Sequence, residues 1–275
     1  MRFIVAILFF VSGFAALGSQ IVWSKLFAAG LGHEIPSVLA TVSALFFGMA
    51  GGACWMDRAT ARTMRPDRVF ALLECVIGIW GVVSTFLIPE ANRLALKLIG
   101  LDPSALRHWL IAFLIPCLAL LPATFAMGAT FPAMYKFVYT SSTNRRVIGG
   151  IYAANTFGAV AGVLFTTFIL LPGISLPKGL FVCAALNLGV AAVMLFLPNG
   201  RRADREPDRN GESVDRKSAS ELFALGLLGI GFELWGTRML SQVLENTIYT
   251  YATILAVFLA GLSAGAAFFQ WFRRN

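Results

Sequence analysis

The sequence is short of charged residues and of metal-binding groups. Of its 275 residues only 13% are charged, about half the share in an average soluble domain. It has 4 cysteines, none in a C-x-x-C pair, and 2 histidines, His33 and His108. Because each cysteine lies in an apolar run, we expect buried, unreactive thiols, with no metal site and no cofactor. These absences exclude a disulfide-stapled secreted domain and a structural zinc protein.

Apolar residues dominate what is present. They make up 58% of the chain and include 24 phenylalanines. The mean hydropathy of the chain is +0.76. This composition excludes a disordered chain and argues against a water-soluble enzyme, because little polar surface is left to cover the apolar side chains. The sequence therefore predicts an all-α polytopic membrane protein whose main partner is the lipid bilayer.

Apolar runs long enough to cross a bilayer recur along the whole chain. A spanning helix needs about 20 mostly apolar residues. Such runs cover residues 3–26, 36–56, 69–89, 109–138, 147–172, 176–197, 219–243 and 247–271. Pro116, Pro122 and Pro132 make bending of the fourth helix an expectation.

Basic residues gather in alternate loops, which predicts the orientation of the chain. Segments 57–68, 136–146 and 198–218 and both ends are rich in Lys and Arg, whereas the opposite loops hold Arg93, Lys97, Arg107 and Lys178. Cytoplasmic loops carry this excess, so both termini are expected on the cytoplasmic side of the cell inner membrane. The net charge of +8 is then mainly an orientation signal, and no nucleic-acid partner is expected.

Two stretches between the spans differ in kind. Residues 199–218 carry many charges of both signs and almost no apolar anchor, which is typical of a solvated linker. The 90–108 stretch contains spaced leucines and Trp109 follows it, which predicts a short amphipathic helix on the outer interface. The predicted organisation is a six-helix membrane repeat at 1–198, a cytoplasmic linker at 199–218, and an incomplete second repeat at 219–275.

An internal repeat supports this division. Residues 13–54 align without gaps onto 226–267, and polar positions match as well as apolar ones. The matched pairs include Gly13/Gly226, Gly18/Gly231, Gln20/Glu233, Ser24/Thr237, Lys25/Arg238, Gly48/Gly261 and Gly52/Gly265. Because six helices separate the copies, both copies cross the membrane in the same direction.

A parallel repeat is the arrangement of the two halves of major facilitator transporters. The segment Gly52-Ala-Cys-Trp-Met-Asp57-Arg58, followed by Arg62, resembles the loop of that fold in which an Asp–Arg pair latches neighbouring helices on the cytoplasmic side. An ordinary basic cytoplasmic loop with one acid is the alternative. Because the second copy has two helices, we expect a truncated or split gene product, or a partner polypeptide that completes the fold.

Several segments together resemble the membrane part of the fused major-facilitator/spermidine-synthase-like family. The most specific are Met127-Gly-Ala-Thr130-Phe-Pro132 and Tyr152-Ala-Ala-Asn155-Thr-Phe-Gly158-Ala. Members commonly carry a glutamate where this chain has Gln20, and Glu233 restores it in the second copy. Many members append an aminopropyltransferase-like domain with a Gly-rich loop, and no such segment is present, so no enzymatic activity is expected.

Glycines spaced four apart occur at Gly48/Gly52, Gly158/Gly162 and Gly261/Gly265. The last pair forms Gly-Leu-Ser263-Ala-Gly, which also fits the nucleophile-elbow pattern of hydrolases. That elbow needs a strand-to-helix turn, whereas this segment lies in a predicted spanning helix. Close packing of helices through small residues is therefore predicted at all three pairs.

Polar groups inside the spans are the candidate functional residues, because each costs about 2.5–3.5 kcal/mol at the bilayer centre when charged. Glu74 and Glu233 are predicted to face a central cavity and bind a cation or a proton. The companion residues predicted to donate or accept hydrogen bonds are Gln20, Tyr152, Asn155 and Asn187. Lys25 and Arg238 lie at helix ends. The alternative is that these groups only tie helices together.

Two functions remain open from the sequence. The first is a transporter-like module for a small solute, a cationic or polyamine-like one included, that works by alternating access. The second is a non-transporting membrane anchor or assembly subunit for a partner such as an aminopropyltransferase-like domain.

Overall fold

A computed structural model describes residues 2–31, 34–60, 65–100, 102–141, 146–197, 216–245 and 247–272. Within these ranges every regular element is a helix, and 8 helices are long and apolar enough to cross a membrane. The prediction of an all-α, multi-pass membrane protein is confirmed. Only helices satisfy their own backbone hydrogen bonds within one segment, which is what hydrocarbon surroundings demand.

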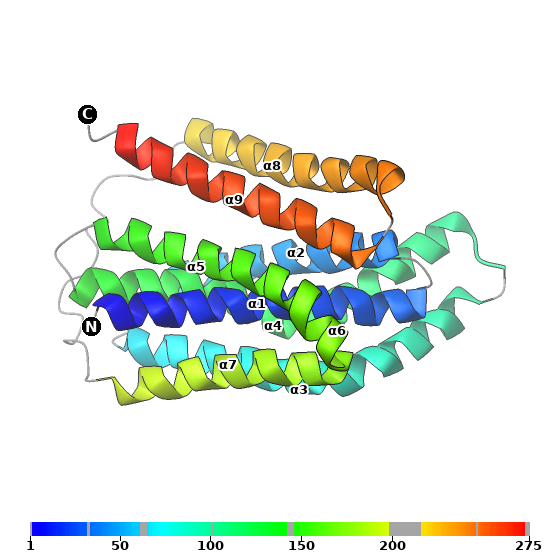
Figure 1. Cartoon of the computed structure of the whole chain (residues 1–275), viewed down its shortest axis with the longest axis horizontal. Coiled ribbons are helices and arrows are strands. Elements are labelled where there is room, and N and C mark those ends of the chain that lie inside the picture. Colours follow the sequence, from blue (N-terminus) through cyan, green and yellow to red (C-terminus); the bar gives the residue numbers. More distant parts are fainter. Residues whose placement is uncertain are drawn as a thin grey trace.

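The helices follow the predicted spans closely (Figure 1). They are α1 (Arg2–Leu31), α2 (Glu34–Thr60), α3 (Pro66–Ile99), α4 (Ala105–Ser141), α5 (Arg146–Phe165), a π-helical turn η1 (Thr166–Leu170), α6 (Leu171–Gly173), α7 (Leu176–Phe196), α8 (Arg216–Val243) and α9 (Ile248–Phe272). The fifth span comprises α5, η1 and α6 together. The fourth stays a single helix across Pro116, Pro122 and Pro132.

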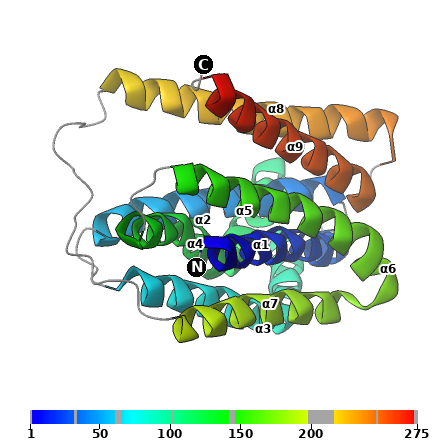
Figure 2. The same cartoon turned by 60° about the vertical axis from the view of Figure 1, so that its left-hand side comes forward.

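Helix α1 lies at the centre of the bundle, and successive spans run in opposite directions (Figures 1 and 2). It packs against α5, α7, α2 and α3, while α2 packs on α4 and α3 packs on both α4 and α7. The α8–α9 hairpin lies along one side of this six-span unit, and α9 contacts α5 and α1. By contrast, α8 contacts chiefly α9.

The predicted amphipathic interface helix at 90–108 is wrong. Helix α3 instead continues through Pro89 to Ile99 and ends at Gly100, whose φ is 74°. The extension is fixed to the end of α1, because the Asn92 Nδ2 donates a hydrogen bond to the Leu26 carbonyl at 2.8 Å. The last turn is held by Arg107, whose Nη2 donates to the Ile99 carbonyl at 2.7 Å. One face of this extension is buried, at Asn92, Ala95 and Ile99, whereas Leu94, Leu96 and Leu98 are exposed.

The cysteine prediction is correct for one residue. Cys183 is buried, Cys75 and Cys117 are half-buried, and Cys54 is exposed on α2, all as free thiols. An apolar neighbourhood in the sequence does not distinguish the inside of a bundle from its lipid-facing surface. Residues 199–215 of the predicted linker, and His33, lie outside the described residues.

Glycines bring two parallel pairs of helices into backbone contact. On α5, a Cβ at Gly158 or Gly162 would overlap the carbonyl of Phe10 or Phe14 on α1. On α2, a Cβ at Gly48 would overlap Thr124, and one at Gly52 would overlap the Phe125 carbonyl on α4. Gly13 and Gly128 supply the matching small positions on α1 and α4, against Asn155 and Met49. The predicted small-residue packing is confirmed at Gly48/Gly52 and at Gly158/Gly162.

The third predicted glycine pair has no such neighbour. A Cβ built on Gly261 or Gly265 meets no atom of the described residues within 4 Å, and the same holds for Gly226 and Gly231 on α8. The prediction of close packing at Gly261/Gly265 is therefore not met by the described residues. Among these residues, the first repeat copy packs its glycines against other helices, and the matched glycines of the second copy have no neighbour.

Matched substitutions test this difference. We expect Gly52→Ala to lower the free energy of unfolding by about 1–3 kcal/mol, because the new Cβ meets a backbone carbonyl that cannot move away. Gly265→Ala, at the matched position on α9, is expected to leave stability unchanged or slightly raised, since Ala is the better helix former. Unfolding in mixed detergent micelles measures both variants. Equal destabilisation by the two substitutions contradicts the packing described.

Candidate functional site

One buried carboxylate lies where α1 and α3 meet. Glu74 on α3 is fully buried, and Ser12 on α1 donates a hydrogen bond from its Oγ to the Glu74 Oε1 at 2.6 Å. The other carboxylate oxygen, Oε2, has no hydrogen-bond partner among the described residues. A carboxylate enclosed in this way is stabilised by a proton or by a cation.

Asn187 lies on α7, which packs against both α1 and α3. Its side chain is buried, and its Oδ1 also lacks a hydrogen-bond partner in the described part of the chain. Ser12, Glu74 and Asn187 thus stand on three mutually packed helices, and two of them keep an unused acceptor oxygen. We refer to the hydrogen-bonded pair of Ser12 and Glu74 as the Glu74 cluster.

A second group of polar residues joins α1 to the α8–α9 hairpin. Gln20 on α1 donates from its Nε2 to the Tyr251 hydroxyl on α9 at 2.8 Å, and both side chains are buried. Glu233 on α8, the other helix of the hairpin, is only 4% exposed. We refer to Gln20, Tyr251 and Glu233 as the Glu233 cluster: the first two join α1 to α9, and the third is the buried acid of the same hairpin.

The matched polar positions also make the same local bond. Ser24 donates from its Oγ to the Gln20 carbonyl at 2.9 Å, and Thr237 donates from its Oγ1 to the Glu233 carbonyl at 2.8 Å. Each hydroxyl is thereby satisfied within its own helix, one turn back. The two polar segments therefore have the same local conformation as well as related sequences.

The two clusters lie at different levels of α1. Ser12 and Gln20 are eight residues apart, which is about 12 Å along a helix axis. The hydrogen bond of Glu74 to α1 therefore lies two turns away from the hydrogen bond by which Gln20 contacts the hairpin. The prediction that Glu74 and Glu233 face one central cavity stays a prediction.

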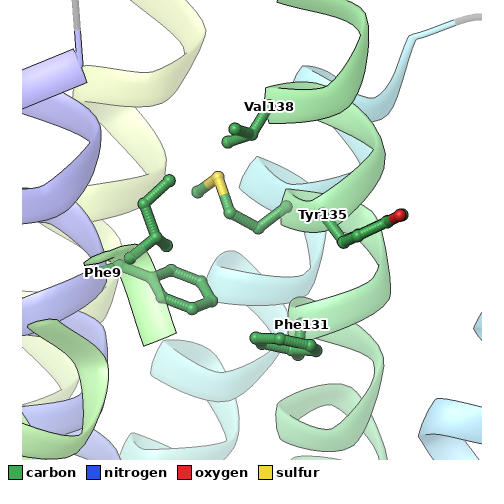
Figure 3. A pocket seen from close by; sticks show the side chains of 6 residues that line it. Phe9, Phe131, Tyr135 and Val138 are labelled. Carbon is green, nitrogen blue, oxygen red and sulfur yellow. The ribbon is translucent and has the colours of Figure 1, made fainter. Parts of the chain in front are cut away.

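The remaining predicted companions lie on α5. Asn155 is half-buried beside Gly13 of α1. Tyr152 is 44% exposed, and its ring packs edge-on against Phe131 of α4 at 5.8 Å. Phe131 also lines a small pocket between α1, α4 and the start of α5, shown in Figure 3. Its walls are apolar, and the Tyr135 ring extends away from Phe9. None of the predicted polar residues lines it.

The charged residues predicted at helix ends are spread over the surface. Asp57 and Arg58 are exposed near the end of α2, and Arg62 lies outside the described residues. Lys25 is half-buried on α1, and Arg238 is exposed on α8. The cytoplasmic latch stays a prediction. Within the described ranges, no three His, Cys, Asp or Glu side chains are grouped so as to hold a metal ion.

Sequence reasoning missed three features of the site. The first is Tyr251, which is 231 positions from Gln20 in the sequence. The second is Ser12, whose matching position just before the second repeat copy is the apolar Leu225. The third feature is the π-helical turn at 166–170, where the buried hydroxyls of Thr166 and Thr167 have no partner among the described residues. Such turns frequently occur at functional sites. The aromatic position of Tyr251, inside an apolar run, gave no local signal.

Comparison with families of known proteins, with curated proteins and with solved structures finds no match to this chain. The resemblance to the fused major-facilitator/spermidine-synthase-like family therefore stays a prediction.

The contact between Gln20 and Tyr251 is open to a direct energetic test. A double-mutant cycle with Gln20→Leu and Tyr251→Phe is expected to give a coupling energy of about 0.6–2 kcal/mol, the range for hydrogen bonds between membrane helices. Tyr249→Phe is the matched control, because Tyr249 is 43% exposed on the same helix and packs on Phe168. A coupling energy no larger than that of the control pair contradicts the contact.

Proposed function

We propose that this chain is a transporter-like module of the cell inner membrane. Its solute is a small organic molecule, such as a cationic or polyamine-like one. The observation that carries the proposal is the Glu233 cluster. It places a buried acid at the seam between the six-span unit and the α8–α9 hairpin, so movement of one part relative to the other changes what surrounds the carboxylate. Alternating access by relative movement of two helical units is the common mechanism of such folds.

The packing of the six spans supports a major facilitator-like arrangement. Suppose that α1, α2 and α3 are exchanged with α4, α5 and α7, in that order. The glycine contact of α1 with α5 then becomes the glycine contact of α4 with α2. In the same way, the contact of α1 with α7 becomes the contact of α4 with α3. Helices related in this way run in opposite directions, which is the nested three-plus-three inverted repeat of major facilitator halves.

The solute class follows from the chemistry of the buried polar residues. Glu74 and Glu233 are buried acids. Gln20 and Asn187 each have an acceptor oxygen that finds no partner in the part of the chain that the structure describes. Buried acceptors and carboxylates favour an ammonium group or a proton over an anion. With the basic loops on the cytoplasmic side, both termini are proposed to be cytoplasmic. No enzymatic activity is proposed for this chain.

A non-transporting membrane anchor or assembly subunit is the second candidate. The open glycines of α8 and α9 favour it, because they offer a surface for another membrane polypeptide. In that case the two clusters serve only to hold helices together.

Neutral variants of the two acids distinguish these functions. We expect putrescine to raise the melting temperature of the purified chain, and Glu233→Gln or Glu74→Gln to weaken its apparent affinity about tenfold, equivalent to losing about 1.4 kcal/mol of charge interaction. Uptake of labelled putrescine into membrane vesicles is expected to fall in parallel.

Glu221→Gln is the matched control, because Glu221 is an exposed acid on the same helix as Glu233. It is expected to behave as the wild type. If neither buried-acid variant changes the response to putrescine, the transport proposal is wrong and the anchor function gains support.

A further inference from the structure

Threonine hydroxyls inside the spans usually bond to their own helix, and the π-helical turn η1 departs from this pattern. Thr124, Thr156 and Thr237 each donate a hydrogen bond to the main-chain carbonyl four residues back, at 3.1, 3.0 and 2.8 Å. Thr166 and Thr167 of η1 are both fully buried, and neither hydroxyl has a partner among the described residues. Burying an unpaired hydroxyl is unfavourable, so such a group in a native structure points to a ligand that satisfies it.

The π-helical turn lies between α1 and α9, and it contacts both helices. On one side, a Cβ at Gly18 of α1 would lie 2.8 Å from the Thr166 hydroxyl oxygen. On the other side, the Phe168 ring packs on the Tyr249 ring of α9, with 5.6 Å between the ring centroids. Thr167 stands between these two contacting residues in the sequence and is itself fully buried. It is therefore enclosed where α1, η1 and α9 meet.

The hydrogen bond between Gln20 and Tyr251 lies at the same level as this turn. Gln20 follows Gly18 by two residues on α1, which is about 3 Å along a helix axis. Val163, one helical turn before Thr167, packs in one buried cluster with Tyr251. Gln20, Thr167 and Tyr251 thus come from three elements that meet at one level, and we refer to them as the junction site.

The unused hydrogen-bonding capacity of the junction site calls for a donor. The Gln20 amide donates from its Nε2 to the Tyr251 hydroxyl, and its Oε1 has no partner in the described part of the chain. An amide oxygen only accepts hydrogen bonds, whereas a threonine hydroxyl both accepts and donates. A ligand that satisfies Gln20 and Thr167 together must therefore carry N–H or O–H groups. Because the three side chains are at most 3% exposed, the group that reaches them must also be small.

We infer that the junction site binds the primary ammonium group of the solute, with the Thr167 hydroxyl as a further binding residue. Binding of this kind rests on the proposed function and narrows the solute to one with a primary amine. A primary ammonium group carries three N–H donors on one nitrogen, whereas a trimethylammonium group carries none and is larger. A cation at membrane depth needs an acid to pair with, and Glu233 is the buried acid of the hairpin that supplies Tyr251.

Two diamines that differ only in methylation test this assignment. Putrescine ends in primary ammonium groups, and its fully N-methylated analogue has the same carbon chain and the same charge but no N–H donor. Binding to the purified full chain in mixed detergent micelles is measured from the rise of the melting temperature with probe concentration. The wild type is expected to bind putrescine at least tenfold more tightly than the methylated analogue.

Thr167→Val removes the hydroxyl and keeps the shape of the side chain. It is expected to weaken putrescine binding at least fivefold and to leave the binding of the methylated analogue unchanged. Without a probe, its melting temperature is expected to equal or exceed that of the wild type, because a methyl group replaces a hydroxyl without a partner among the described residues. Thr167→Ser keeps a hydroxyl and is expected to bind putrescine within twofold of the wild type.

Thr156→Val is the matched control, because Thr156 is a buried threonine of the same span whose hydroxyl bonds to the Tyr152 carbonyl. It is expected to bind both probes as the wild type does. Wild-type affinity of Thr167→Val for putrescine overturns the assignment in favour of water as the only ligand, and the proposed function still stands if Glu233→Gln weakens binding. Equal binding of the two probes by the wild type, or an equal loss of both in Thr167→Val, also overturns the assignment. A wild type that responds to neither probe contradicts the assignment and the proposed solute together.

Discussion

Backbone contact between helices at glycine is the interaction on which the rest of this structure depends. At Gly52 and Gly158 the helices approach so closely that a single methyl group would meet a carbonyl of the neighbouring helix. In a bilayer no hydrophobic effect drives helices together, so close packing must supply the attraction. The crossings of α1 with α5 and of α2 with α4 fix four spans. Helices α3 and α7 then pack onto that frame and enclose Glu74.

The hairpin is held in a different way. No glycine on α8 or α9 approaches another described helix. Helix α9 is joined to the six-span unit by apolar packing and by the hydrogen bond from Gln20 to the Tyr251 hydroxyl. Its buried apolar side chains, Ile248, Ala252 and Leu255, pack in one cluster with Ile21, Val42 and Val163. Helix α8, in contrast, is attached chiefly through α9.

Sequence patterns predicted the spans and the small-residue crossings, because apolar length and glycine spacing are local properties. They failed at α3, which continues to Ile99 as one helix and bonds to the end of α1 through Asn92, a contact that no local pattern indicates. Gln20 and Glu233 could be paired through the repeat, but Tyr251 could not, since contacts over such a separation leave no periodic signal. The contact of Glu74 with Ser12 of α1 could not be predicted either, because it depends on how the helices pack, which residue spacing alone does not determine.

Crosslinking of positions 20 and 251 in native membranes tests the attachment of the hairpin most directly. In a background without the native cysteines, Gln20→Cys with Tyr251→Cys is expected to form an intramolecular disulfide or to react readily with a short bifunctional thiol reagent. Gln20→Cys with Tyr249→Cys, which places the second thiol on the more exposed face of α9, is expected to react far less. Equal reaction of both pairs, or reaction of neither, contradicts a hairpin joined to α1 through Gln20 and Tyr251.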